Sequence, residues 1–146
     1  MKEKERLMGA LKHEEVDRPP VVCPGGMMNM VTTDLMKVAG VKWPEAHRDA
    51  QMMADLSYAS YKNGCFENVG LPFDMVAEAE QMGAEITLGT EVFEPHVTGY
   101  AIESIADWPR LKPMDMNSGR IKVILDAMRI LKKKDPDVPI IGNITG

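Results

Sequence analysis

Asp74 is the side chain best placed for chemistry in this sequence. It follows an apolar stretch, residues 66–71, that is predicted to be a strand, and a Pro72-Phe73 turn. An aspartate that faces a pocket can accept hydrogen bonds from N–H groups or stabilise a nearby cation. Aspartate is also among the best helix N-caps, and a helix is predicted from Asp74 to Met82. The sequence supports both roles, and one residue can fill both.

A loop rich in glycine and methionine, residues 24–30, is the second candidate. Its Gly25, Gly26, Met27 and Met28 suit an apolar ligand or a protein partner, because flexible methionine side chains re-pack against different surfaces. Methionine also fills gaps in protein cores, and the chain contains 13 of them. A binding role and a packing role therefore both stay open for this loop.

The sequence lacks the spacings that mark metal sites. Cys23 and Cys65 are isolated, and there is no CxxC, HxC or HxxxH pair. Cys23 ends a predicted strand and is expected to be a small buried apolar residue. His13, His47 and His96 are far apart and lie on predicted surface segments. We therefore expect no metal site in this chain and no catalytic histidine.

Composition narrows the class of protein. The formal net charge is -5, whereas nucleic acid and anionic membranes both attract clustered Lys and Arg, so neither is an expected partner. No apolar run approaches the roughly 20 residues that a membrane span needs. Without a signal peptide, the two cysteines are expected to be reduced thiols in a cytoplasmic protein.

Hydrophobic periodicity and end signals predict the elements that position these residues. Helices are expected over residues 2–12, 32–40, 44–64, 74–82 and 118–134, and strands over residues 21–23, 66–71 and 138–144. Alternation of strands and helices predicts an α/β fold with parallel βαβ units, the last helix covering one sheet made by the three strands. Two extended segments, 85–88 and 98–102, flank a loop. The last strand has no helix after it, which predicts an incomplete domain.

Three blocks resemble the uroporphyrinogen decarboxylase superfamily. Residues 5–20 read ERLMGALKHEEVDRPP and are similar to its opening, closest to the branch of corrinoid-dependent methyltransferases such as methylcobalamin:coenzyme M methyltransferases. Pro72-Phe73-Asp74 followed by residues 81–86, and then residues 138–142, resemble two further blocks. They occur in the family's order and span nearly the whole chain.

The resemblance implies a TIM-type (β/α)8 barrel, which needs at least about 200 residues, so residues 1–146 would be its N-terminal portion. In such barrels the site lies at the carboxyl ends of the strands. Substrate-binding positions are then expected in two groups, the loop residues Gly25, Gly26, Met27 and Met28, and the strand-end residues Phe73 and Asn143. Asp74 matches the family's pocket aspartate and is expected to be catalytic, with its carboxylate pointing into the cleft near the loop.

The charge of the loop favours one branch of the family. Decarboxylases of the family resemble one another in an Arg-rich loop after the first strand, which suits a substrate with eight carboxylates, whereas loop 24–30 contains no cation. We therefore expect methyl transfer from a methyl-corrinoid to a thiol such as coenzyme M, with a corrinoid protein or a small molecule as partner. The resemblance also implies zinc, bound by a His-x-Cys pair and a later Cys in the missing C-terminal half of the barrel. The fragment alone is expected to bind no cofactor and to be inactive.

Two alternatives stay open. One is uroporphyrinogen decarboxylase proper, a cofactor-free enzyme of porphyrin biosynthesis. The other is a non-catalytic half-barrel module that pairs with a complementary chain, or self-associates as a homo-oligomer, through the open edge of its last strand.

Overall fold

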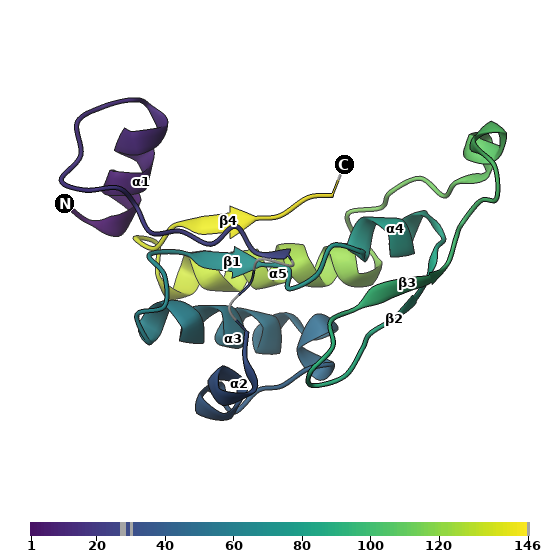
Figure 1. Cartoon of the computed structure of the whole chain (residues 1–146), viewed down its shortest axis with the longest axis horizontal. Helices are drawn as coiled ribbons and strands as arrows, with labels where there is room; N and C mark the ends of the chain where they lie inside the picture. Colours follow the sequence, from purple (N-terminus) through teal and green to yellow (C-terminus); the bar gives the residue numbers. More distant parts are fainter. Residues whose placement is uncertain (27–28, 30, 146) are drawn as a thin grey trace.

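The computed structural model describes residues 1–26, 29 and 31–145, which form an α/β arrangement (Figure 1). Its α-helices are α1 (Glu3–Leu11), α2 (Thr33–Ala39), α3 (Ala50–Lys62), α4 (Ala77–Met82) and α5 (Gly119–Lys134). Two 3-10 helices are η2 (Glu45–His47) and η3 (Ile105–Arg110). The strands are β1 (Val69–Leu71), β2 (Glu85–Thr87), β3 (His96–Gly99) and β4 (Ile140–Gly142).

Strands β1 and β4 pair in parallel, with Val69 opposite Ile140 and Leu71 opposite Gly142. Parallel neighbours require a crossover connection, and here α5 supplies it. The parallel pairing predicted for these two strands is confirmed, and the α/β class with it. Their shared direction places both carboxyl ends at the same edge.

The predicted strand at residues 21–23 is wrong. This segment does run beside β1, because a Cβ on Gly70 would lie 2.9 Å from the carbonyl oxygen of Cys23. However, the side-chain amide of Asn68 takes over the backbone pairing. Its Oδ1 accepts from the Cys23 N–H at 2.8 Å, and its Nδ2 donates to the Cys23 carbonyl at 2.7 Å. The backbone groups of Cys23 are thus satisfied by a side chain and not by a strand ladder.

Helices α3 and α5 lie side by side against one face of the strands and build the core (Figure 1). Met53 and Leu56 of α3 are fully buried, as is Leu71 of β1, and Leu131 of α5 is nearly so. This confirms that the last helix covers the strands. The predicted helix over residues 44–64 is instead two elements, since Asp49 caps a fresh start by accepting from the Met52 N–H at 2.8 Å.

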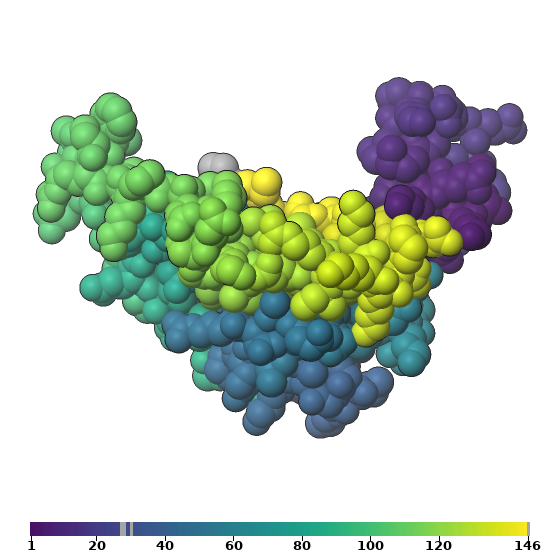
Figure 2. Space-filling model, turned by 180° about the vertical axis from the view of Figure 1, so that it is seen from behind, coloured from purple at the N-terminus to yellow at the C-terminus, as the bar shows by residue number. Residues whose placement is uncertain are grey.

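Two projections extend beyond opposite ends of the strands (Figure 1). Helix α1 lies at the amino ends, where the buried guanidinium of Arg6 bonds Asp17 through Nε at 2.7 Å and Glu67 through Nη1 at 3.1 Å. The antiparallel β2–β3 pair and η3 lie beyond the carboxyl ends. Figure 2 shows a concave face between the two projections. Within the described part of the chain, no helix is both long and apolar enough to cross a membrane.

Candidate functional site

The carboxyl ends of β1 and β4 bring three of the predicted site segments together. The N–H of Gly26 donates to the Pro72 carbonyl at 2.8 Å, and the N–H of Asn143 donates to the Leu71 carbonyl at 2.9 Å. These bonds join the glycine loop and the end of β4 to the turn 71–75. We use "the mouth" for this turn together with the described residues Gly25, Gly26, Asn29, Asn143 and Thr145.

Both glycines of the mouth are required by close contacts. Gly25 has φ +88°, and a Cβ there would lie 2.9 Å from the Leu71 backbone nitrogen. Gly26 has φ +62°, and its Cβ would lie 1.9 Å from Nδ2 of Asn143. Any larger residue would combine left-handed backbone strain with a clash. Glycine at these positions lets the loop approach β1 and lets the Asn143 amide pack over it. Met27 and Met28, also predicted to bind substrate, lie outside the described residues.

Asn29 is a residue of the mouth that sequence reasoning missed. Its Nδ2 donates to the Gly26 carbonyl at 2.6 Å and to the Phe73 carbonyl at 3.0 Å, and its Oδ1 accepts from the Val31 N–H at 2.9 Å. The sequence offered one indication of this role, because Asn29 is the single amide side chain among the methionines of the loop. Asn29 therefore joins the glycine loop to the turn after β1.

The Phe73 side chain is buried in the core. It is 1% exposed, and its ring centroid lies 6.1 Å from those of both Trp43 and His47, which are 4.9 Å from each other. Its carbonyl accepts a hydrogen bond from Asn29 Nδ2. The ring anchors the turn in the core, and contact of Phe73 with substrate stays a prediction.

Asp74 is buried in an ion pair rather than directed into an open cleft, so the predicted orientation is wrong. Its side chain is fully buried, and Arg120 binds it with both terminal nitrogens, at 2.7 Å to Oδ2 and 3.0 Å to Oδ1. It is also not a helix N-cap, because α4 begins at Ala77 and Oδ1 accepts from the Val76 N–H at 3.0 Å. A bidentate guanidinium attracts the carboxylate inward more strongly than an exposed helix end could. A catalytic role for Asp74 stays a prediction.

Arg120 and Glu80 complete this buried cluster, and neither was identified from the sequence. Nε of Arg120 bonds Oε2 of Glu80 at 2.6 Å, and the Arg120 side chain is 4% exposed. Burial alone would lower the pKa of Arg120, but hydrogen bonds and charge from Asp74 and Glu80 outweigh it and hold that pKa above its usual value. The guanidinium is thus a permanent cation whose partners are both carboxylates of this cluster.

His47 also belongs to the cluster, so its predicted surface position is wrong. The side chain is 0% exposed, and Nδ1 lies 3.5 Å from Oδ2 of Asp74 without hydrogen-bond geometry. Burial lowers the pKa of His47 to about 4; the Asp74 charge opposes this and the Arg120 charge adds to it. His47 is therefore neutral in the folded protein near pH 7.

This neutral histidine predicts a loss of stability in acid. The unfolded state takes up a proton near pH 6.5, whereas the folded state resists it down to about pH 4. The His47 contribution to stability is therefore complete above pH 6.5 and declines as the pH falls towards 4, by roughly 3 kcal/mol. Urea unfolding of His47→Asn between pH 7 and pH 4.5 should show a shallower decline than the wild type. His96→Asn, at an exposed site, is the control, and its free energy of unfolding should fall with pH as steeply as that of the wild type. The same pH dependence in the wild type and both variants would contradict the prediction.

The described residues do not form a metal site. Among them, no group of three or more His, Cys, Asp or Glu side chains could hold an ion. Cys23 is buried beside the mouth and Cys65 is exposed, and neither lies with a histidine in such a group. Zinc does not fit the donor set found here.

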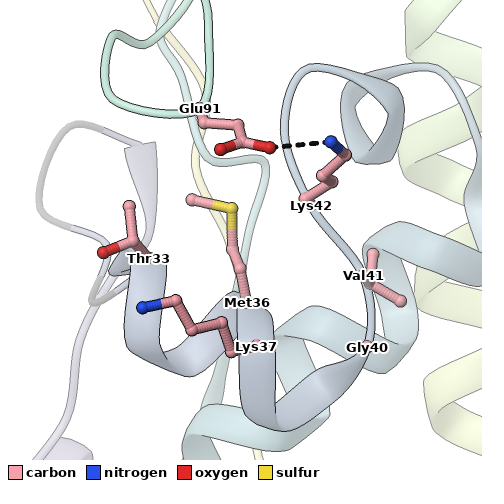
Figure 3. A pocket seen from close by; sticks show the side chains of 7 residues that line it. All are labelled: Thr33, Met36, Lys37, Gly40, Val41, Lys42 and Glu91. Carbon is pink, nitrogen blue, oxygen red and sulfur yellow. Dashed lines mark hydrogen bonds and ion pairs between the residues drawn. The ribbon is translucent and has the colours of Figure 1, made fainter.

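A separate hollow of about 320 Å³ lies between α2 and the turn that joins β2 to β3 (Figure 3). Lys42 and Glu91 face each other across it, with Nζ 2.7 Å from Oε1, and Met36 forms part of its wall. Both charged side chains are more than half exposed, so solvent screens the pair and it adds little stability. None of the predicted site residues that the structure describes lines this hollow.

Known proteins resemble this chain along almost its whole length. A family model described as "Uroporphyrinogen decarboxylase (URO-D)" matches residues 2–146. The chain is 40% identical to the methylcobamide:CoM methyltransferase MtbA of Methanosarcina acetivorans and 37% identical to MtaA of Methanosarcina barkeri. Each alignment covers 144 residues, 98% of this chain and 42% of the relative.

A solved structure shows the same similarity at the level of the fold. A methyltransferase from Methanosarcina mazei superimposes with a TM-score of 0.90 at 38% identity, covering 100% of this chain and 43% of that one. The chain thus spans about two fifths of the length of these proteins. Its fold is the corresponding part of a TIM-type barrel, as predicted. By sequence match and by structure, the chain belongs to the uroporphyrinogen decarboxylase (URO-D) family.

Proposed function

We propose that this chain is the N-terminal portion of an enzyme that transfers a methyl group from a methyl-corrinoid to a thiol such as coenzyme M. The observation that carries the proposal is the similarity, over 98% of the chain, to proteins named methylcobamide:CoM methyltransferases. The activity is assigned to the complete protein, because the chain spans only about two fifths of those relatives.

The charge of the mouth supports this choice of substrate. Gly25, Gly26, Asn29 and Asn143 are uncharged. The guanidinium of Arg120 approaches the same turn, but it is 4% exposed and already binds two carboxylates. A substrate with many carboxylates would therefore find no free cation among these residues, whereas a thiol such as coenzyme M, with a single sulfonate, needs far fewer.

The chemistry divides between the cofactors and the protein. A bound methyl-corrinoid supplies a methyl group that a thiolate, the reactive form of a thiol, can accept. Zinc is implied by the family resemblance as the ion that lowers the pKa of the thiol. Because the described residues hold no suitable donor cluster, we assign the zinc ligands to sequence outside this chain. The mouth contributes a wall that presents no free charge among the described residues.

The proposal also includes the compartment of the enzyme and its partners. We assign it to the cytoplasm, with a corrinoid protein or a small methyl-corrinoid as donor. Within the complete enzyme, this portion would pack against the remaining part of the barrel.

Two other functions have one observation each in their favour. Uroporphyrinogen decarboxylation is favoured by Asp74, which matches the family's pocket aspartate. A non-catalytic half-barrel is favoured by the free side of β4, which pairs only with β1 among the described strands. An apolar hollow of about 220 Å³, lined in part by Met114, Met128 and Ile144, lies beside that strand.

Methylcob(III)alamin and coenzyme M test the proposal directly. The complete enzyme, loaded with zinc, should demethylate the cobalamin and form methylated thiol in equal amounts, followed by cobalamin absorbance and by mass spectrometry. The isolated 146-residue chain should show no turnover, because it lacks most of the barrel. Decarboxylation of uroporphyrinogen without methyl transfer would replace the proposal with its first alternative. Turnover by the homogeneous isolated chain would show that the mouth alone suffices.

A further inference from the structure

The turn 71–75 is the hub of the mouth. Its carbonyl oxygens accept hydrogen bonds from two separate segments of the chain, the loop 24–30 and the end of β4. Leu71 accepts from the Asn143 N–H at 2.9 Å, and Pro72 from the Gly26 N–H at 2.8 Å. Two further bonds come from side chains, Asn29 Nδ2 to the Phe73 carbonyl at 3.0 Å and Thr145 Oγ1 to the Met75 carbonyl at 3.1 Å. A rotation of this turn would therefore displace the glycine loop, Asn29 and the end of β4 together.

The Asp74 carboxylate holds the turn from the other side. Its atoms are buried, and it meets Arg120 of α5 and, at a longer distance, His47 of η2. We propose that Arg120 is a positioning residue, which fixes the orientation of the turn 71–75 through its bidentate bond to Asp74 and so sets the shape of the mouth.

The place of Arg120 in its helix supports this inference. It is the second residue of α5, at the positive end of the helix dipole, where a cation is disfavoured and an anion is preferred. Burial of the guanidinium adds a desolvation cost. Both costs are offset by the carboxylates of Asp74 and Glu80, which come from the turn and from α4. The arginine thus ties the turn, α4 and α5 into one unit.

The inference deepens the proposed function and rests on it. Since the Asp74 carboxylate is 0% exposed, it acts on a bound thiol or corrinoid through the turn and not by contact. Small displacements of positioning groups slow a reaction by large factors, because reacting atoms must meet in a narrow geometry. The expected effect of losing Arg120 is therefore a slower chemical step and not only a less stable protein.

The test compares Arg120→Met, Arg120→Lys and Asp74→Asn in the complete enzyme, with Leu131→Ala as the matched control. Leu131 is a core residue near the other end of the same helix, 2% exposed, so its variant is expected to lower stability without releasing the turn. At a temperature where all variants are folded, Arg120→Met should lower kcat for methyl transfer by about 10- to 100-fold. Arg120→Lys should retain more activity because it keeps the charge, and Leu131→Ala should stay within about twofold of wild type.

A double variant separates positioning from direct contact. Asp74→Asn/Arg120→Met should be no slower than the worse single variant, because both act through one bond. The inference is overturned if Asp74→Asn abolishes turnover while Arg120→Met is fully active, since the carboxylate would then contact substrate itself. It is equally overturned if Leu131→Ala at matched melting temperature loses as much activity as Arg120→Met.

Hydrogen exchange supplies a readout that needs no activity. The amides of Gly26 and Asn143 should exchange faster in Arg120→Met than in Leu131→Ala, because both donate to the turn. If the wild type transfers no methyl group, the proposed function fails, while exchange at these amides still decides whether Arg120 orders the mouth. Unchanged exchange in Arg120→Met would refute the inference.

Discussion

Replacing Asp74 by alanine is expected to lower the free energy of unfolding by about 3–5 kcal/mol, since it leaves the buried Arg120 guanidinium without its bidentate partner. The N-cap role suggested by the sequence would have predicted at most about 2 kcal/mol. The larger value follows from burial, because the guanidinium keeps only Glu80 as a partner and its freed nitrogens cannot regain water where the side chain is 4% exposed. Urea unfolding at pH 7 measures the difference.

Two further variants make this expectation specific. Asp74→Leu combined with Arg120→Met should recover most of the loss, since a buried pair replaced by apolar groups of similar size is often neutral. Asp126→Ala should change stability little, because its partners on α5, Lys122 and Arg129, are more than half exposed. A loss for Asp74→Ala no larger than that for Asp126→Ala would show that the buried pair does not form.

Replacing Phe73 by alanine is expected to cost about 3–5 kcal/mol, the range for deleting a buried aromatic ring. The ring is 1% exposed and packs against both Trp43 and His47, so its removal leaves a cavity bounded on one side by aromatic rings. Such a site collapses poorly, which places the cost towards the upper part of the range. Thermal or urea unfolding gives the measurement.

Phe93→Ala is the matched control, because that ring is 67% exposed on the turn between β2 and β3. It should change stability by no more than about 0.5 kcal/mol. The result for Phe73 also bears on its predicted substrate contact. If Phe73→Ala were as stable as the wild type yet altered KM for the thiol or the corrinoid, the ring would belong to the mouth and not to the core.

Elements governed by local signals were predicted well from the sequence. Helix α2 begins after Thr32, whose side chain accepts from the Leu35 N–H, and ends at Gly40 with φ +67°. Helix α5 follows Ser118, and Ile121, Ile124 and Leu131 of its apolar stripe are buried. Helix N-caps, the glycines that end helices and the apolar faces of helices each involve residues within one or two turns of each other. They can therefore be recognised directly in the sequence.

Several features that depend on contacts between distant side chains were not predicted. The strand expected at residues 21–23 is absent because Asn68, 45 residues from Cys23, satisfies its backbone. Arg120 was overlooked because it lies 46 residues from Asp74, and His47 because its segment carries no sign of burial. Nothing in the types or spacing of these residues indicates which of them will meet.

The sequence by itself determined the α/β class, the parallel pairing of β1 with β4, the family and the uncharged glycine loop of the mouth. The family follows from the resemblance of three sequence blocks, and the others follow from periodicity, alternation and residue type. The tertiary structure alone decided that Asp74 faces Arg120 and not an open cleft. It also decided that Phe73 packs in the core and that His47 is held neutral. Each of these depends on burial and on a partner from another element, and only packing of the whole chain determines both.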